Sequence, residues 1–113
     1  MNQNWKKSEL KSNLNPVSLS PEELALFFAE FPNWSLDLKS DVRIKKITRE
    51  FKFPNFLQAF GYVSKIALLS EKLDHHAEIY NSYGLVKITL FTHSSKDITD
   101  LDRLFAFHAE SLL

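Results

Sequence analysis

The sequence predicts an α+β domain with a four-stranded antiparallel sheet and three helices packed on one face of that sheet. Three observations lead to this prediction. Helix-like and strand-like segments follow one another in the order αββαββα. Only short turns separate the strands within each pair, and such strands pair antiparallel because a parallel pair needs a long crossover. The apolar positions recur at helical or alternating spacing, which favours one core between the sheet and the helices.

The first helix has the clearest start in the sequence. Residues 1–18 before it are polar and aperiodic, so we expect a flexible tail followed by a single domain over residues 19–113. Ser20 is suited to the N-cap, proline follows it, and Glu23 completes a capping box. This helix should end near Glu30, before a Phe-Pro-Asn sequence.

Two strands are expected next. Residues 34–38 alternate between apolar and polar, and so do residues 47–53. The apolar positions of residues 42–44 have the opposite phase. A β-bulge near Lys45 and Lys46 would join both halves into one second strand.

The longest helix should begin after Asn55, a favourable N-cap residue, and end near Leu73. Gly61 lies in its middle, where glycine costs about 1 kcal/mol relative to alanine. We expect close packing against another element to compensate for this cost. Adjacent histidines then fall in the turn that follows the helix.

Two further strands and a closing helix complete the predicted domain. The strands are expected at residues 78–81 and 86–92, and Thr99 should cap a helix that runs to about Leu112. Alternation in the last strand places Phe91 on the sheet face away from the helices. An exposed phenylalanine there indicates a subunit contact or the wall of a ligand site.

Composition excludes several classes of protein. The chain of 113 residues has zero formal net charge, and its basic residues are interspersed with acidic ones, which argues against direct nucleic-acid binding. No apolar run approaches the roughly 20 residues that span a bilayer, so we expect no membrane segment. Cysteine is absent, so the fold does not rely on disulfides. These features together favour a cytoplasmic protein.

Three histidines form the candidate catalytic group. His75 and His76 are adjacent, and His93 lies eighteen residues after His75, at the end of the last strand. Glu71 lies one helical turn before the pair, and Asp102 follows Thr99 at capping-box spacing. Imidazole changes its charge near neutral pH, so such a cluster suits proton transfer. We expect the three imidazoles to meet at one cleft.

Other interpretations of these residues remain open. Histidines in polar turns are often simply solvated, and Glu71 would then be a solvated helix residue. Asp102 could act only in the capping box with Thr99. Three histidines could bind zinc with an open fourth position. Two adjacent residues seldom reach one ion, so we expect no metal site.

Several segments together resemble the pterin-4a-carbinolamine dehydratases, a family that includes dimerization cofactors of a homeodomain transcription factor. The similarity extends from about Leu19 to Leu112. It rests on the sequences Glu71-Lys-Leu-Asp-His-His-Ala-Glu78, Val86-Lys-Ile-Thr-Leu-Phe-Thr-His93 and Ile98-Thr-Asp-Leu-Asp102.

The resemblance implies a reaction and a set of residues. The reaction is loss of water from 4a-hydroxytetrahydropterin to give quinonoid dihydropterin, without a metal or organic cofactor, which recycles the pterin used by aromatic amino-acid hydroxylases. The catalytic residues would be His75, His76, His93 and Asp102. The residues that bind the substrate or tune the histidines would be Glu71, Asp74, Phe91 and Thr92. The family also implies a homodimer or homotetramer. A member acting as a coactivator or assembly partner, or binding a pterin without turnover, remains an alternative.

The sequence also departs from the family pattern. Ala77 replaces a proline that is common after the histidine pair. Lys96 and Asp97 stand where many members have glycines, and aspartate tolerates a left-handed backbone better than lysine does. We therefore expect the loop after His93 to follow a different path.

Overall fold

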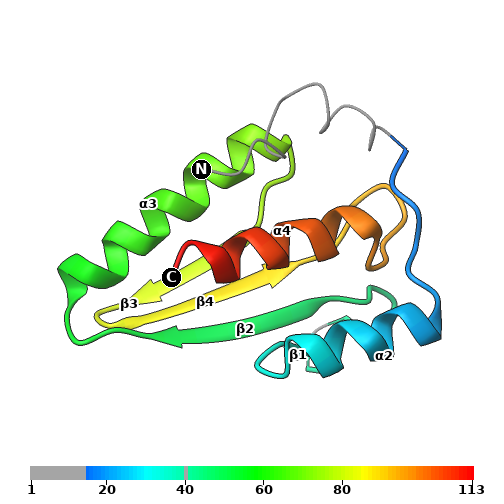
Figure 1. Cartoon of the computed structure of the whole chain (residues 1–113), viewed down its shortest axis with the longest axis horizontal. Helices are drawn as coiled ribbons and strands as arrows, with labels where there is room; N and C mark the ends of the chain where they lie inside the picture. The colour runs from blue at the N-terminus through cyan, green and yellow to red at the C-terminus, as the bar shows by residue number, and fades with distance from the viewer. Residues whose placement is uncertain (1–14, 40) are drawn as a thin grey trace.

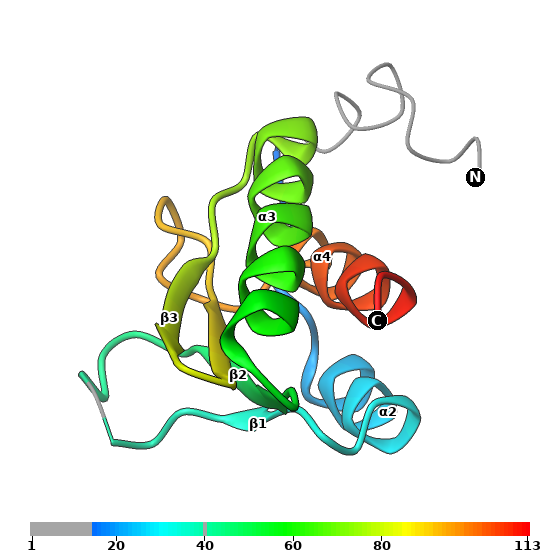
Figure 2. The ribbon, with the colours of Figure 1, turned by 90° about the vertical axis from the view of Figure 1, so that its left-hand side faces the viewer.

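The computed structural model describes residues 15–39 and 41–113. Its elements are helix α2 (Pro21–Glu30), strands β1 (Ser35–Leu36) and β2 (Ile47–Lys52), helix α3 (Phe56–Leu73), strands β3 (Glu78–Ser82) and β4 (Leu85–Leu90), and helix α4 (Asp100–Ser111). The strands form one antiparallel sheet in the order β1-β2-β4-β3. All of these helices lie on one side of the sheet (Figure 1, Figure 2). The predicted fold class and element order are confirmed.

The predicted helix starts are confirmed as well. Ser20 and Glu23 form a reciprocal capping box at the start of α2. Asn55 accepts a hydrogen bond from a backbone N–H at the start of α3. Thr99 and Asp102 form a second capping box at the start of α4. Each cap satisfies backbone donors that the first helical turn leaves without partners.

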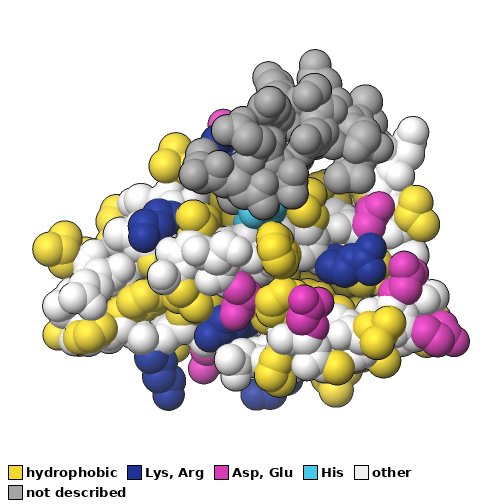
Figure 3. Space-filling view, viewed as in Figure 1, with side chains coloured by type: hydrophobic (Ala, Val, Ile, Leu, Met, Phe, Trp, Pro, Cys, Tyr) yellow, Lys and Arg dark blue, Asp and Glu magenta, His cyan; other side chains and the backbone are white. Residues whose placement is uncertain are grey.

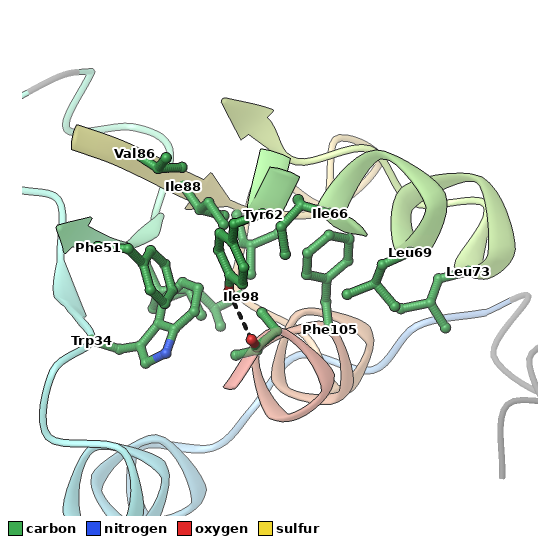
Figure 4. Packing of buried hydrophobic residues seen from close by; sticks show 14 of the residues in the cluster. Trp34, Phe51, Tyr62, Ile66, Leu69, Leu73, Val86, Ile88, Ile98 and Phe105 are labelled. Atoms are coloured by element: carbon green, nitrogen blue, oxygen red, sulfur yellow. Dashed lines mark hydrogen bonds between the residues drawn. The ribbon is translucent and has the colours of Figure 1, made fainter. Parts of the chain in front are cut away.

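The core fills the space between the helices and the inner face of the sheet (Figure 4). Ile66 and Phe105 are fully buried from the helix side. Val86, Ile88 and Leu90 of β4 are buried from the sheet side, as the alternation predicts. The Tyr62 hydroxyl, also shown in Figure 4, donates to the Ala109 carbonyl at 2.7 Å and ties α3 to α4. This tie holds in place the two helices whose ends carry the candidate site.

The predicted first two strands are longer than the observed ones, and the predicted bulge near Lys45 and Lys46 is wrong. β1 contains only two residues, and β2 begins at Ile47. Residues 41–46 form a loop in which the Asp41 carboxylate accepts hydrogen bonds from the backbone and guanidinium of Arg43. Aspartate at the start of a turn favours this arrangement. The change of apolar phase therefore marks a loop.

The expectation that Phe91 is exposed is also wrong. The residue is only 7% exposed. The ammonium group of Lys46 lies 4.7 Å from the ring centre, and the His93 ring lies 4.3 Å away. β4 ends at Leu90, so Phe91 belongs to the connection after the strand. The loop before β2 supplies the lysine that covers it, which the alternation within one strand could not reveal.

The two glycines have different surroundings. A Cβ built on Gly61 meets no atom within 4 Å, so the expected close packing is wrong. A Cβ on Gly84 would lie 2.3 Å from the Phe53 carbonyl oxygen. The Phe53 N–H also donates to the Gly84 carbonyl at 2.8 Å. Gly84 is therefore required by the close approach of the β3–β4 turn to the end of β2.

The described chain is already paired before the domain boundary expected at residue 19. The Val17 N–H donates to the Asp100 carboxylate at 3.2 Å, and Ser18 forms an isolated bridge with Thr99. Of the predicted tail over residues 1–18, residues 1–14 lie outside the described residues. Within the described part, no helix is long and apolar enough to cross a membrane.

Candidate active site

The turn after α3 separates the two adjacent histidines. Asp74 adopts a left-handed backbone conformation, with φ 50° and ψ 45°, and terminates the helix. Aspartate tolerates this conformation better than most residues. The His75 N–H donates to the Ser70 carbonyl at 3.0 Å, which closes the turn. His75 is consequently buried at 8% exposure, whereas His76 is exposed.

His75 is held by the carboxylate of Asp102, which is 0% exposed. The Nε2 atom of His75 lies 2.5 Å from Oδ1 of Asp102. Oδ2 accepts hydrogen bonds from the Thr99 backbone N–H and the Thr92 hydroxyl, each at 2.9 Å. The ring of Phe105 packs against the imidazole edge, with 6.2 Å between centroids. A buried carboxylate with three donors is well satisfied and can orient an imidazole.

This contact assigns the proton on the His75 ring. A carboxylate only accepts hydrogen bonds, so Nε2 carries the hydrogen that lies between the two groups. In the neutral imidazole the other nitrogen, Nδ1, then has a free lone pair. His75 is therefore set up to accept a proton at Nδ1.

His76 forms a second pair of the same kind at the surface. Its Nε2 atom contacts the carboxylate of Glu71, five residues earlier. The side chains are 61% and 75% exposed. Exposed ion pairs contribute little to stability. The pair therefore orients an accessible imidazole and adds little to the stability of the domain.

His93 follows Thr92 and stacks against Phe91. Because Thr92 donates to Asp102, the chain segment that carries His93 is tied to the carboxylate that holds His75. The structure thus brings Asp102, Thr92 and His75 into one network. The convergence of all three imidazoles on one cleft stays a prediction. Among the described residues, no group of three or more histidine, aspartate or glutamate side chains is arranged to hold a metal ion.

The loop after His93 contains Lys96 and Asp97, which depart from the family pattern. The Thr92 N–H donates to the Asp97 carbonyl at 2.9 Å, and the Lys96 N–H donates back to the Thr92 carbonyl at 2.8 Å. Lys96 has a left-handed φ of 54°, so the lysine adopts the conformation that glycine would favour. These backbone hydrogen bonds hold the loop closed with Lys96 in the left-handed conformation.

Thr99 belongs to this network, although the sequence indicated only a helix cap. Its hydroxyl lies 2.7 Å from the Thr92 hydroxyl and is fully buried. The signal that could have revealed it is the capping box itself, because Asp102 in that box was already a candidate catalytic residue. A residue that positions Asp102 must also affect His75, which Asp102 contacts.

A hollow elsewhere in the fold contains none of the predicted site residues. It has a volume of about 860 Å³ and lies along β1 and β2, where Arg49, Lys52 and Lys87 contribute to its lining. β1 pairs with only two residues of β2, so the rest of that strand edge borders the hollow. The connected side chains around Asp102 therefore define the candidate site better than cavity size does.

The sequence and the fold match those of a known family. The model of the pterin 4 alpha carbinolamine dehydratase family matches residues 17–112. A protein of Prochlorococcus marinus strain NATL2A, provisionally named a pterin-4-alpha-carbinolamine dehydratase, is 42% identical over 95 residues, which cover 84% of this chain and 94% of the relative. The chain belongs to the pterin-4a-carbinolamine dehydratase family.

Solved structures agree with this assignment. A Brucella melitensis protein described as a transcriptional coactivator/pterin dehydratase has a TM-score of 0.74 and 38% identity, with 85% of this chain and 98% of that chain covered. A pterin dehydratase-like protein identified as a RuBisCO assembly factor in the alpha-carboxysome has a TM-score of 0.59 and 23% identity, with 71% and 88% covered. The second comparison supports the shared fold alone.

Proposed function

We propose that this protein removes water from a 4a-hydroxytetrahydropterin to give quinonoid dihydropterin by histidine general acid–base catalysis. Such a reaction recycles the cofactor of aromatic amino-acid hydroxylases. Family membership supports the reaction class. The observation that carries the mechanism is the buried pair of Asp102 and His75, adjacent to the exposed pair of Glu71 and His76.

The reaction requires two proton transfers and no change of oxidation state. The bond between C4a and its hydroxyl oxygen breaks, and the oxygen leaves as water after it gains one proton. The N5–H bond also breaks, and its electron pair forms the new double bond between N5 and C4a. The residues need only accept a proton from N5 and give a proton to the leaving oxygen, for which positioned imidazoles are suited.

We assign the base to His75. Its Nε2–H is engaged by Asp102, so Nδ1 is the nitrogen that accepts the N5 proton. The imidazolium formed in this way is stabilised by the adjacent carboxylate. In this proposal, His76 or His93 gives the proton to the leaving oxygen, because both are exposed to an incoming substrate.

The other candidate residues support these groups. Glu71 orients His76, and Asp74 forms the turn that carries the histidine pair. Phe91 packs against the His93 ring, while the Thr92 hydroxyl donates to Asp102 inside the protein. Phe91 and Thr92 are 7% and 5% exposed, so in the proposed site they support His93 and Asp102 from inside the protein. No metal or organic cofactor takes part in the proposed steps.

The proposal is tested by generating the 4a-hydroxy intermediate and following its loss by ultraviolet absorbance. Added protein should accelerate the loss above the spontaneous rate, in proportion to its concentration. The variant His75→Gln should lose about 100-fold or more of this acceleration. A wild-type protein that binds a pterin yet leaves the rate unchanged would instead support a binding role.

We also propose that the protein assembles into a homodimer or homotetramer. The sequence suggested Phe91 as a contact, but its ring is covered within the chain. Exposed apolar side chains instead follow α3, where Leu57 is 81% and Leu68 is 70% exposed. Figure 3 shows hydrophobic side chains at the surface over this helix. The outer face of α3 is therefore the surface to test for assembly.

The cytoplasmic location that the sequence suggested stays a prediction.

A further inference from the structure

Two buried threonine hydroxyls are linked to the Asp102 carboxylate by hydrogen bonds. The Oγ1 atoms of Thr99 and Thr92 are 2.7 Å apart, and the Thr92 hydroxyl donates to Oδ2 of Asp102 at 2.9 Å. The three residues are 0%, 5% and 0% exposed, respectively. Buried polar groups need hydrogen-bond partners, since unmet ones are costly away from water. The three side chains therefore constrain one another.

The direction of these hydrogen bonds follows from counting protons. Each hydroxyl has one hydrogen to donate. The hydrogen of Thr92 is used on Asp102, so Thr99 is the donor in the bond between the two hydroxyls. The Thr99 oxygen also lies 3.4 Å from Oδ2, a longer and weaker contact than the 2.7 Å bond to Thr92. The hydroxyls thus form a relay from Thr99 through Thr92 to Asp102, in which each bond polarises the next.

This relay determines which carboxylate oxygen faces His75. Oδ2 already accepts the Thr92 hydroxyl and the Thr99 backbone N–H. Rotation of the carboxylate would break both bonds inside the protein. Oδ1 is therefore the oxygen that remains for Nε2 of His75.

Helix capping alone does not explain the arrangement. The cap uses the Thr99 oxygen as an acceptor for backbone N–H groups and the Asp102 carboxylate as an acceptor for the Thr99 N–H. The hydrogen of the Thr99 hydroxyl is not needed for these bonds. Thr92 lies outside the helix, yet its hydroxyl donates to the same carboxylate oxygen. Its contribution is an additional constraint on Asp102.

We propose that Thr92 and Thr99 are positioning residues that hold Asp102 so that His75 keeps its hydrogen on Nε2 and presents Nδ1 as the proton acceptor. The catalytic part of this inference rests on the proposed dehydratase function. The structural part concerns the protonated nitrogen of one imidazole. It can be measured whether or not the protein turns over a pterin.

The experiment compares Thr92→Val, which keeps the side-chain shape and removes the hydroxyl, with Thr92→Ser, which keeps the hydroxyl. Thr89→Val is the matched control. Thr89 is another buried threonine, three residues earlier in β4, and its hydroxyl pairs with that of Thr48 at 3.2 Å instead of contacting Asp102. Thr92→Ala serves as a second hydroxyl deletion if the valine variant does not fold.

The first readout is the ring ¹⁵N spectrum of His75, which distinguishes the two neutral tautomers. The wild type, Thr92→Ser and Thr89→Val should show hydrogen on Nε2. Thr92→Val should show a mixture of tautomers. The relay is overturned if wild-type His75 has its hydrogen on Nδ1, or if the hydroxyl deletions leave the ring signals unchanged.

The second readout is the pH profile of kcat for dehydration. Thr92→Val should lower kcat about 10-fold, by analogy with residues that orient a functional histidine, and move the limb that reports the base. KM should change less, and Thr92→Ser should restore the profile. If the wild type accelerates no dehydration, the proposed function fails, while the ring spectrum still decides the relay.

Discussion

Oδ1 of Asp102 lies 2.5 Å from Nε2 of His75, and this contact joins residues that are 27 positions apart. The same carboxylate completes the capping box at the start of α4. One buried side chain therefore starts a helix and orients an imidazole in the turn after another helix. Its removal should affect both stability and catalysis, so variants elsewhere are needed to separate these effects.

The exposed pair of Glu71 and His76 should matter for turnover and little for stability. We expect Glu71→Gln and His76→Gln to change the free energy of unfolding by less than about 0.5 kcal/mol, because exposed ion pairs contribute little. If His76 is the acid, His76→Gln should lower kcat by about 100-fold and remove the limb of the pH profile at higher pH. Urea unfolding and pH-rate profiles measure both.

His93→Gln is the comparison for that experiment, since His93 is the other exposed candidate acid. The limb should disappear in one of the two variants and remain in the other. A pH-rate profile that is unchanged in both variants would show that neither histidine is the general acid.

Stability should fall as the pH drops below neutrality, in part because of His108. Burial lowers the pKa of this imidazole in the folded protein. The unfolded chain, with a histidine pKa of about 6.5, therefore binds more protons in the window below that value. Stability is then fully present above the unfolded pKa and decreases as the pH falls through that window. Urea unfolding from pH 7 to pH 5 should give a shallower dependence for His108→Gln than for the wild type.

The same slope in both proteins would show that His108 does not contribute to this dependence. The slope is the proper readout because replacement of a buried side chain also shifts stability at every pH. That constant shift cancels when only the pH dependence is compared.

The two glycines should respond in opposite ways to alanine. Gly61→Ala should stabilise the protein by about 1 kcal/mol, because the site is open and alanine favours a helix. Gly84→Ala should destabilise it by about 2 kcal/mol, because the new methyl group would collide with the Phe53 carbonyl. Thermal and urea unfolding of both variants check this. Destabilisation by Gly61→Ala would indicate that this surface is packed in solution, for example against a second copy.

Assembly should depend on the exposed face of α3. Light scattering should give at least twice the 13.1 kDa mass of the chain. Leu57→Asp should reduce that mass, because a charged group would enter the contact. Leu38→Asp is the control, since Leu38 is equally exposed at 78% but follows β1. A wild-type monomer at all concentrations, or equal effects of both variants, would contradict the assignment of this face.

The sequence predicted most elements because their ends carry local signals. Ser20 and Thr99 each form a side-chain cap that is visible at fixed spacing from an acidic residue. The second strand was predicted too long because residues 42–44 contain apolar side chains in a loop that the Asp41 turn determines. Phe91 was expected on an exposed face of the last strand, but it follows that strand and is covered by Lys46 from another segment. Contacts between distant segments leave no periodic signal.

The candidate site was likewise predictable where its residues are neighbours in sequence and not where distant segments meet. His75, His76 and Glu71 could be grouped because they occupy consecutive turns of the chain. The bond between Asp102 and His75 could not follow from spacing, and the family resemblance implied only that Asp102 belongs to the catalytic group. The part played by Thr99 was hidden by its obvious function as a cap. A residue that satisfies one local rule can therefore carry a second role that only the three-dimensional arrangement reveals.

The most direct test of this account is the dehydration rate of Asp102→Asn beside His75→Gln and the double variant. Asparagine can still accept the Thr99 N–H, but its amide would donate to His75 and favour hydrogen on Nδ1. We predict that each single variant lowers kcat about 100-fold or more. The double variant should be no slower than the less active of the two single variants, because the two residues act as one unit. Asp102→Asn with a rate within about threefold of the wild type would contradict the central claim that the Asp102–His75 pair accepts the proton.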